Sequence, residues 1–128
     1  MRLLTHNMLQ SNVRGTTNGY PLNIEVENAI IEESPVETEL IKRLLPKIDY
    51  KVLKRAIQQI SSHLPLPVLG ELPERLSEDI DDETVLSLLH TVLMDVHVLE
   101  GHLVCPDSGR KFPIKQGIPN MILHEDEI

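Results

Sequence analysis

The chain has 128 residues, a length that fits one domain or a compact domain carrying one inserted subdomain. Its apolar fraction of 41% is sufficient for a core, which must consist mainly of Leu, Ile and Val because Tyr20, Tyr50 and Phe112 are the only aromatic residues. The formal net charge of −8, with 20 acidic and 12 basic side chains, argues against direct, tight nucleic-acid binding by this chain alone.

The first predicted element is a half-buried strand at 21–31, preceded by a turn at 17–19. Its apolar and polar residues alternate, as in Leu22, Ile24 and Val26. A helix is predicted to follow, with Ser34 as the N-cap, Pro35 at the first helical position and a Glu that completes a capping box. Its apolar residues recur at helical spacing and end near residue 46.

Two more helices are predicted in the middle of the chain. Asp49 is expected to cap the second, whose apolar stripe is Val52, Leu53, Ala56, Ile57 and Ile60. The proline-rich stretch 63–73 is expected to be a loop. The third helix should begin after Asp81 or Asp82, with a stripe formed by Val85, Leu88, Leu89, Val92 and Leu93.

The apolar spacing then changes to one typical of strands. Segments 96–99 and 102–105 are expected to form a hairpin closed by a tight turn at 100–101, and His97 and His102 would be cross-strand neighbours at the surface. A further turn at 105–109 precedes a third strand at 110–115. This order predicts an α+β fold, in which both termini share one small sheet and the helices at 34–95 are an insertion.

The segment Cys105-Pro-Asp-Ser-Gly109 has the form of a zinc knuckle that lacks its second cysteine. Ser108 stands where the second thiolate would be, and a neutral hydroxyl is a poor zinc ligand. We therefore expect a ribbon-type turn without a metal. The single cysteine excludes an internal disulfide and suits a reducing intracellular compartment, and we find no signal peptide or membrane-spanning run.

The sequence contains no recognisable catalytic constellation. The six histidines occur in no His-Glu-x-x-His or comparable pattern, and no Gly-rich phosphate loop is present. Cys105 could be considered a nucleophile with a histidine base, but beside a predicted turn it is better interpreted as a small buried side chain. We therefore predict no catalytic residue, no metal ligand and no cofactor.

The C-terminal segment 117–125 is unusually apolar for the end of a chain. It places Ile118, Met121, Ile122 and Leu123 close together, and Pro119 removes one backbone donor, as is typical of an edge strand. Two interpretations remain open from the residues alone. The segment is either the last strand of the protein's own core or an apolar edge that docks on another protein by strand addition.

Four segments resemble the eukaryotic multifunctional methyltransferase subunit family: 1–9, Asn18-Gly-Tyr-Pro-Leu22, Glu100-Gly-His-Leu-Val-Cys-Pro-Asp-Ser-Gly-Arg-Lys-Phe-Pro-Ile114 and Gly117-Ile-Pro-Asn-Met-Ile-Leu123. The resemblance implies a small zinc-ribbon-like antiparallel sheet formed by 1–33 and 96–128, with a helical insertion at 34–95. It also implies that Ser11, Thr16 and Ser108 stand at zinc-ligand positions of the family, so that Cys105 alone remains.

The resemblance further implies a function. The chain would be a non-catalytic activating and stabilising subunit of Rossmann-like, S-adenosylmethionine-dependent methyltransferases that act on tRNA, rRNA and translation release factor. It would bind them one at a time as heterodimers, in the cytoplasm and nucleus. The expected partner-binding residues are Leu4, Thr5, Asn7, Met8, Leu9, Phe112, Pro113, Ile114, Ile118, Pro119, Asn120 and Met121.

Some of these residues must belong to the ribbon's own core, and the sequence does not distinguish them. The alternative function is a metal-free ribbon module that binds RNA directly through Arg110, Lys111 and Lys115. The acidic balance and the scarcity of aromatic stacking platforms argue against that alternative.

Overall fold

The structure, a computed structural model, describes residues 1–63, 72–76 and 82–128. Its elements in chain order are α1 (Leu3–Met8), β1 (Asn23–Ile31), α2 (Thr38–Leu44), the 3-10 turn η1 (Leu45–Lys47), α3 (Tyr50–Ile60), α4 (Glu83–His90), the π-helical turn η3 (Thr91–Asp95), β2 (Val96–Val104), β3 (Lys111–Lys115), β4 (Ile118–Pro119) and the 3-10 turn η4 (Glu125–Glu127). The predicted α+β class is confirmed.

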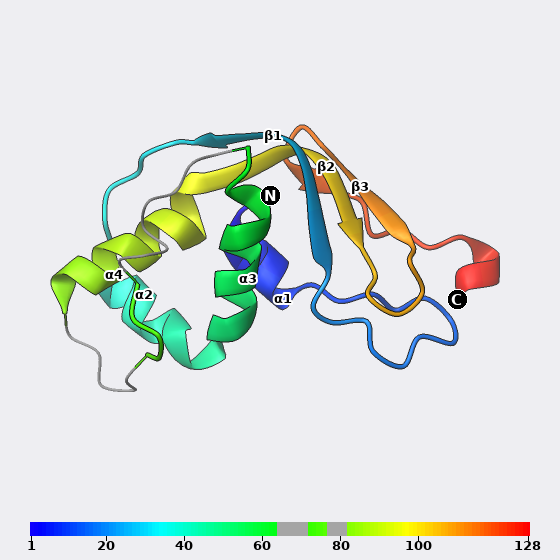
Figure 1. The fold of residues 1–128 in the computed structure, drawn as a ribbon, viewed down its shortest axis with the longest axis horizontal. Helices are drawn as coiled ribbons and strands as arrows, with labels where there is room; N and C mark the ends of the chain where they lie inside the picture. The colour runs from blue at the N-terminus through cyan, green and yellow to red at the C-terminus, as the bar shows by residue number, and fades with distance from the viewer. Residues whose placement is uncertain (64–71, 77–81) are drawn as a thin grey trace.

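The strands form one antiparallel sheet of order β1-β2-β3-β4, so β1 and β4 are its edges. In Figure 1 the helices gather against one half of the two long strands β1 and β2, while the β2–β3 hairpin and the C-terminus extend on the other side. The prediction that segments near both termini share one sheet is confirmed. The division into a ribbon domain and an insertion stays a prediction, because one hydrophobic core cluster runs through both parts.

The predicted hairpin at 96–105 is wrong, because β2 is one continuous strand. Gly101 does not turn the chain but lies opposite an irregularity in β1, where the register shifts between Val26 and Ala29. A Cβ on Gly101 would lie 2.1 Å from the backbone oxygen of Glu25, so this close approach requires glycine. His97 and His102 therefore lie on the same strand and are not cross-strand neighbours.

Two of the three predicted helices begin where expected. Asp49 caps α3 by accepting from the N–H of Val52 at 3.2 Å, and the whole predicted stripe of α3 is buried. Asp82 caps α4 by accepting from Thr84 N–H at 2.9 Å. The predicted stripe of α4 is partly wrong, because this helix buries Leu86 and Leu89 while Val85 and Leu88 are only half-buried. The loop predicted at 63–73 lies mostly outside the described residues.

The predicted cap at Ser34 is wrong, and one helix was not predicted. α2 begins at Thr38 with Glu37 as a cap that makes no side-chain hydrogen bond, since the Ser34 hydroxyl instead donates to Asp95 Oδ1 at 2.5 Å. α1 was missed because two of its inward-facing residues, His6 and Asn7, are polar. In the described part of the chain, no helix is long and apolar enough to cross a membrane.

Candidate protein-docking surface

Both predicted binding segments meet at one place in the fold. The amino nitrogen of Met1 donates to the backbone oxygens of Val98 at 2.7 Å and Gly117 at 2.6 Å, and the N–H of Gly117 donates to Leu99 O at 2.9 Å. These bonds connect the segment before α1 to the middle of β2 and to the start of β4. The structure therefore brings together the two terminal motifs that the sequence separates by more than 100 residues.

The residues of the N-terminal motif, on α1 and at its C-cap Leu9, divide by exposure. Met8 is 51% exposed and Thr5 is exposed, whereas Leu4 and Leu9 are half-buried and pack against the core. Asn7 is buried: its Nδ2 donates to Asp49 O, and its Oδ1 accepts from the N–H of Asp49, both at 2.9 Å. Asn7 therefore holds α1 against the start of α3, and Met8 and Thr5 are the residues of this helix that a partner can reach.

The C-terminal motif divides in the same way. Phe112 and Ile114 are fully buried in the core, so they support the sheet beneath the surface. Ile118 is 68% exposed on β4, and Asn120 is exposed just after it. Pro113, Pro119 and Met121 are half-buried, and Met121 packs against the core.

Ile122 is not among the predicted partner-binding residues, although it is 76% exposed. Its exposure follows from the way the chain leaves the sheet. After β4, the N–H of Asn120 donates to Pro113 O at 2.9 Å, and the Asn120 side chain then accepts from the N–H of Ile122 at 3.0 Å. This local turn directs Ile122 away from the core, and an Asn after a proline is the signal that could have indicated it.

We define the β4 edge by the outer side of β4 together with the exposed side chains of Ile118 and Ile122. β4 pairs only with β3, through Ile114 opposite Pro119 and Lys115 opposite Ile118. An outer strand with exposed isoleucines offers both backbone groups and apolar area to another protein. The opposite edge is partly occupied, because Gln59 of α3 accepts from the N–H of Ile24 on β1 at 2.9 Å.

The zinc-knuckle turn is held by hydrogen bonds that connect it to the N-terminal loop. Asp107 Oδ2 accepts from the N–H of Thr17 at 2.7 Å, from its hydroxyl at 3.1 Å and from the N–H of Asn18 at 3.3 Å, and these bonds lower the pKa of Asp107. The N–H of Ser11 donates to Gly19 O at 2.8 Å, and a Cβ on Gly19 would lie 2.1 Å from Ser11 O. The loop at 11–19 therefore lies against the knuckle.

The residues around the knuckle do not fit a zinc ion. One thiol and three neutral hydroxyls stand at the presumed ligand positions, and the buried hydroxyl of Thr16 has no hydrogen-bond partner. Burial raises the pKa of Cys105, but hydrogen bonds from Ser108 and Ser11 and from the backbone outweigh it and lower the pKa to about 7. The expected absence of a metal stays a prediction, supported by this donor chemistry. No group of three or more His, Cys, Asp or Glu within the described residues could hold a metal ion.

Within the part of the chain that the structure describes, Ser34, His90 and Asp95 form an arrangement that resembles catalytic machinery. The Ser34 hydroxyl lies 2.9 Å from His90 Nε2 and donates to Asp95 Oδ1, and Asp95 Oδ1 lies 3.6 Å from the same nitrogen of His90. In a hydrolytic triad the acid and the serine contact opposite ring nitrogens. Here Ser34 and Asp95 both lie near His90 Nε2, while His90 Nδ1 is buried without a partner, so the cluster lacks triad geometry. Its contacts instead connect the loop after β1 to η3.

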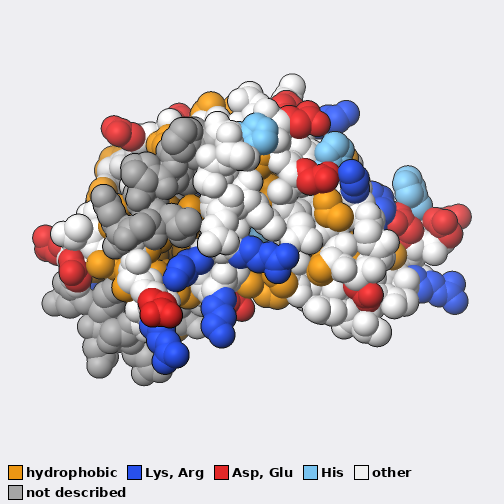
Figure 2. All heavy atoms as spheres, in the orientation of Figure 1, with side chains coloured by type: hydrophobic (Ala, Val, Ile, Leu, Met, Phe, Trp, Pro, Cys, Tyr) orange, Lys and Arg blue, Asp and Glu red, His pale blue; other side chains and the backbone are white. Residues whose placement is uncertain are grey.

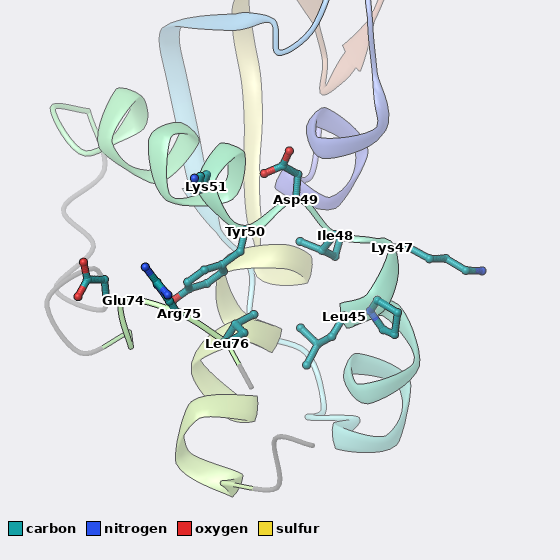
Figure 3. A pocket seen from close by; sticks show the side chains of 10 residues that line it. Leu45, Lys47, Ile48, Asp49, Tyr50, Lys51, Glu74, Arg75 and Leu76 are labelled. Atoms are coloured by element: carbon teal, nitrogen blue, oxygen red, sulfur yellow. The ribbon is translucent and has the colours of Figure 1, made fainter. Parts of the chain in front are cut away.

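A hollow of about 1110 Å³ lies between the start of α3 and residues 74–76. Figure 3 shows Leu45, Ile48 and Leu76 around the Tyr50 ring, with Lys47 pointing away. Asp49 at its margin is already used as the cap of α3. The lining is divided equally between apolar residues and charged ones, which are Lys47, Asp49, Lys51, Glu74 and Arg75. No hydrogen bond or ion pair joins these charged side chains to one another within the described residues, so we assign no chemistry to the hollow.

The fold and surface define a class of protein: a small ribbon-type α+β module with an apolar sheet edge. A chain of the solved E. cuniculi Mtq2–Trm112 complex, responsible for the methylation of the eRF1 translation termination factor, has this fold, with a TM-score of 0.58 and 16% identity over 95% of each chain. The model of the Trm112p-like protein family matches residues 2–117, and the chain belongs to that family.

Relatives named as methyltransferase subunits match along their full length. The chain is 43% identical over 131 residues to multifunctional methyltransferase subunit TRM112 homolog A of Arabidopsis thaliana, with 100% of both chains covered. It is 42% identical over 129 residues to the TRM112-like protein of Mus musculus, covering 99% of this chain and 98% of that one. The family resemblance inferred from the terminal motifs is confirmed.

Proposed function

We propose that this chain is a non-catalytic subunit that activates and stabilises S-adenosylmethionine-dependent methyltransferases acting on tRNA, rRNA and translation release factor. It binds several Rossmann-like partners one at a time as heterodimers, in the cytoplasm and nucleus. The observation that carries the proposal is the β4 edge, where Ile118 and Ile122 are 68% and 76% exposed, on a chain whose relatives are named methyltransferase subunits.

The β4 edge binds the partner by strand addition and apolar contact. Backbone groups on the outer side of β4 pair with an edge strand of the partner's sheet, and the two isoleucines are covered by apolar side chains. Met8 and Thr5 extend the contact on the neighbouring α1 motif. Because the complex contains only the folded partner, binding stabilises that partner's folded, substrate-competent state by mass action.

The partner supplies the cofactor pocket and the chemistry. The polar clusters of this chain that could act chemically already have structural roles. His90 and Asp95 are buried at 3% exposure beside Ser34, and Cys105 is 1% exposed within the knuckle. A side chain that cannot reach a substrate cannot act on it, which supports a non-catalytic role.

The alternative of a ribbon that binds RNA directly is not favoured, because its basic stretch is neutralised internally. Arg110 Nε lies 2.6 Å from Glu127 Oε2, and Lys111 Nζ lies 3.0 Å from Glu25 Oε1. Two of the three cations that this alternative requires are thus paired with carboxylates, which lowers their value for phosphate binding.

Affinity purification of the tagged chain from cell extract, with partners identified by mass spectrometry, tests the proposal. We expect methyltransferases in near-stoichiometric amounts, each in a separate complex with one copy of this chain. A Cys105→Ser variant is the control for catalysis by this chain: it should assemble the same complexes and support full methylation. Recovery of no methyltransferase, or loss of methylation in an intact Cys105→Ser complex, would contradict the proposal.

A further inference from the structure

We propose that the outward face of α3 binds the phosphate backbone of the RNA on which a methyltransferase partner acts. The proposal rests on the proposed function, because it assumes an RNA substrate held by a heterodimer. We define the cationic face as Lys51, Lys54 and Arg55 together with Gln58 and Gln59.

Positive charge is concentrated around this helix on an otherwise acidic chain. Residues 42–55 contain six of the twelve Lys and Arg side chains and one of the twenty Asp and Glu side chains. This short segment therefore has a net charge of +5, and the remainder of the chain has a net charge of −13. Lys42 on α2 is paired with Glu39, whereas three of the six cations lie on α3, so the excess positive charge is centred on this helix although the overall charge is negative.

The helix presents its charges on the side opposite its core stripe. Val52, Leu53, Ala56, Ile57 and Ile60 are buried, whereas Lys51, Arg55 and Gln58 are exposed and Lys54 is half-buried. With 3.6 residues per turn, these polar residues share one face of the helix. Figure 2 shows Lys and Arg side chains gathered in the region where Figure 1 places α3.

The three cations have no carboxylate partner within the described residues. Lys111 and Arg110 on the sheet, in contrast, are each paired with a glutamate. Arg55 Nη2 donates to the neutral side chain of Asn23 at 3.0 Å, and Lys54 Nζ lies 5.5 Å from the centre of the Tyr50 ring. These contacts position two of the charges without neutralising them, so both remain available to an anion.

The arrangement is unfavourable for the helix itself. Lys51 is three residues from Lys54 and four from Arg55, spacings at which like charges destabilise a helix by about 0.2–0.5 kcal/mol per pair. Lys51 is also the second residue of α3, where the helix dipole disfavours a cation. The N-cap carboxylate of Asp49 offsets part of these effects, but the first turn itself contains no acidic residue. An anionic ligand across this face would relieve both.

The chemistry of the face favours RNA phosphates over a protein. All five side chains carry N–H donors, and none of the large exposed apolar residues of the described chain lies on α3. Protein interfaces have an apolar centre, whereas contacts to phosphates come from Lys, Arg and amide donors. α3 packs beside β1, at the sheet edge opposite β4, so the cationic face is separate from the β4 edge.

The test titrates the full chain into a fluorescein-labelled 20-base-pair RNA duplex and measures fluorescence anisotropy at 50 and 150 mM salt. We expect weak binding, with a Kd on the order of 10⁻⁵–10⁻⁴ M, and a roughly tenfold loss of affinity between the two salts for about three phosphate contacts. The variant Lys51→Gln/Lys54→Gln/Arg55→Gln should reduce the affinity about tenfold at 50 mM salt and lower the salt slope by about two to three.

The matched control, Arg14→Gln/Lys111→Gln/Lys115→Gln, removes the same charge from exposed residues elsewhere and should reduce the affinity less than about threefold. Equal losses of RNA affinity in both variants would overturn the proposal. Tighter binding of polyglutamate than of the duplex would also overturn it, because that result would indicate an acidic protein as the ligand. Circular dichroism verifies that both variants are folded. The α3 variant should still co-purify with a methyltransferase, because the β4 edge is unchanged. If the wild-type chain itself did not co-purify with a methyltransferase, that result would refute the proposed function and not the role of α3.

Discussion

The exposure of the isoleucines at the β4 edge allows the loss of partner affinity on their replacement to be predicted quantitatively. Complete burial of an isoleucine side chain contributes about 1.5–3 kcal/mol. Ile118 and Ile122 are 68% and 76% exposed in the free chain, so about 1–2 kcal/mol from each remains to be gained in a complex. The double variant Ile118→Asp/Ile122→Asp should therefore weaken the heterodimer by about 2–4 kcal/mol, or roughly 30- to 700-fold in Kd.

The assay measures Kd by biolayer interferometry with a purified partner, after thermal unfolding has shown that the variant is intact. Because both side chains are exposed, their replacement should change Tm by less than about 3 °C. The matched control is Ile30→Asp/Ile31→Asp, two isoleucines that are 40% and 41% exposed at the end of β1 on the opposite sheet edge. A large loss with this control and none with the β4 variant would refute the assignment of the docking edge.

Three further predictions concern the fold. Gly101→Ala should lower the free energy of unfolding by about 2–3 kcal/mol in chemical denaturation, because its Cβ would lie 2.1 Å from Glu25 O; an unchanged midpoint would refute the close approach. His6 Nε2 lies 2.7 Å from Leu22 O, its Nδ1 is buried without a partner, and burial lowers the pKa of the ring. The unfolded state therefore binds more protons than the folded state, so the free energy of unfolding should fall as the pH falls below 6.5. His6→Gln should flatten that pH dependence, and an equally steep profile would assign it to another group. EDTA should leave Tm unchanged within about 1 °C, whereas a large drop would show that Cys105 belongs to a metal site.

Local sequence signals were sufficient to predict a helix where its cap and its buried stripe both follow them. α3 was predicted together with its Asp49 cap and its buried stripe, because cap and stripe both lie within one dozen residues. Ser34 shows the opposite case. Its capping signature is as clear, but the buried Asp95, 61 residues later, accepts from its hydroxyl, and α2 begins at Thr38 instead. A tertiary contact thus overrides the local preference.

Two other differences have the same origin. Glu100-Gly101 between apolar runs matches a hairpin turn and a bulge equally well, and the choice depends on the backbone of Glu25 in a distant strand. α1 carries no continuous apolar stripe, because His6 and Asn7 bury polar atoms that find partners only in the folded chain. Neither outcome can be derived from spacing alone.

The candidate docking surface was predicted as a segment but not residue by residue. The apolar C-terminal run indicated either a core strand or an exposed edge, and the structure contains both: Met121 and Leu123 pack against the core, while Ile118 is 68% exposed. Alternation cannot separate these outcomes in a strand as short as β4. The cationic face was missed because its charge was averaged into a total of −8, although counting charges in windows would have revealed it.

Reconstitution of methyl transfer from purified proteins tests whether this chain activates a methyltransferase without catalysing the reaction itself. A methyltransferase that co-purifies with this chain is prepared alone and then mixed with increasing amounts of the chain, and transfer of tritiated methyl groups from S-adenosylmethionine to its substrate is measured. We expect little activity from either protein alone and a rise that saturates at one copy of this chain per methyltransferase. Full activity of the methyltransferase without this chain, or methyl transfer by this chain without the methyltransferase, would contradict this expectation.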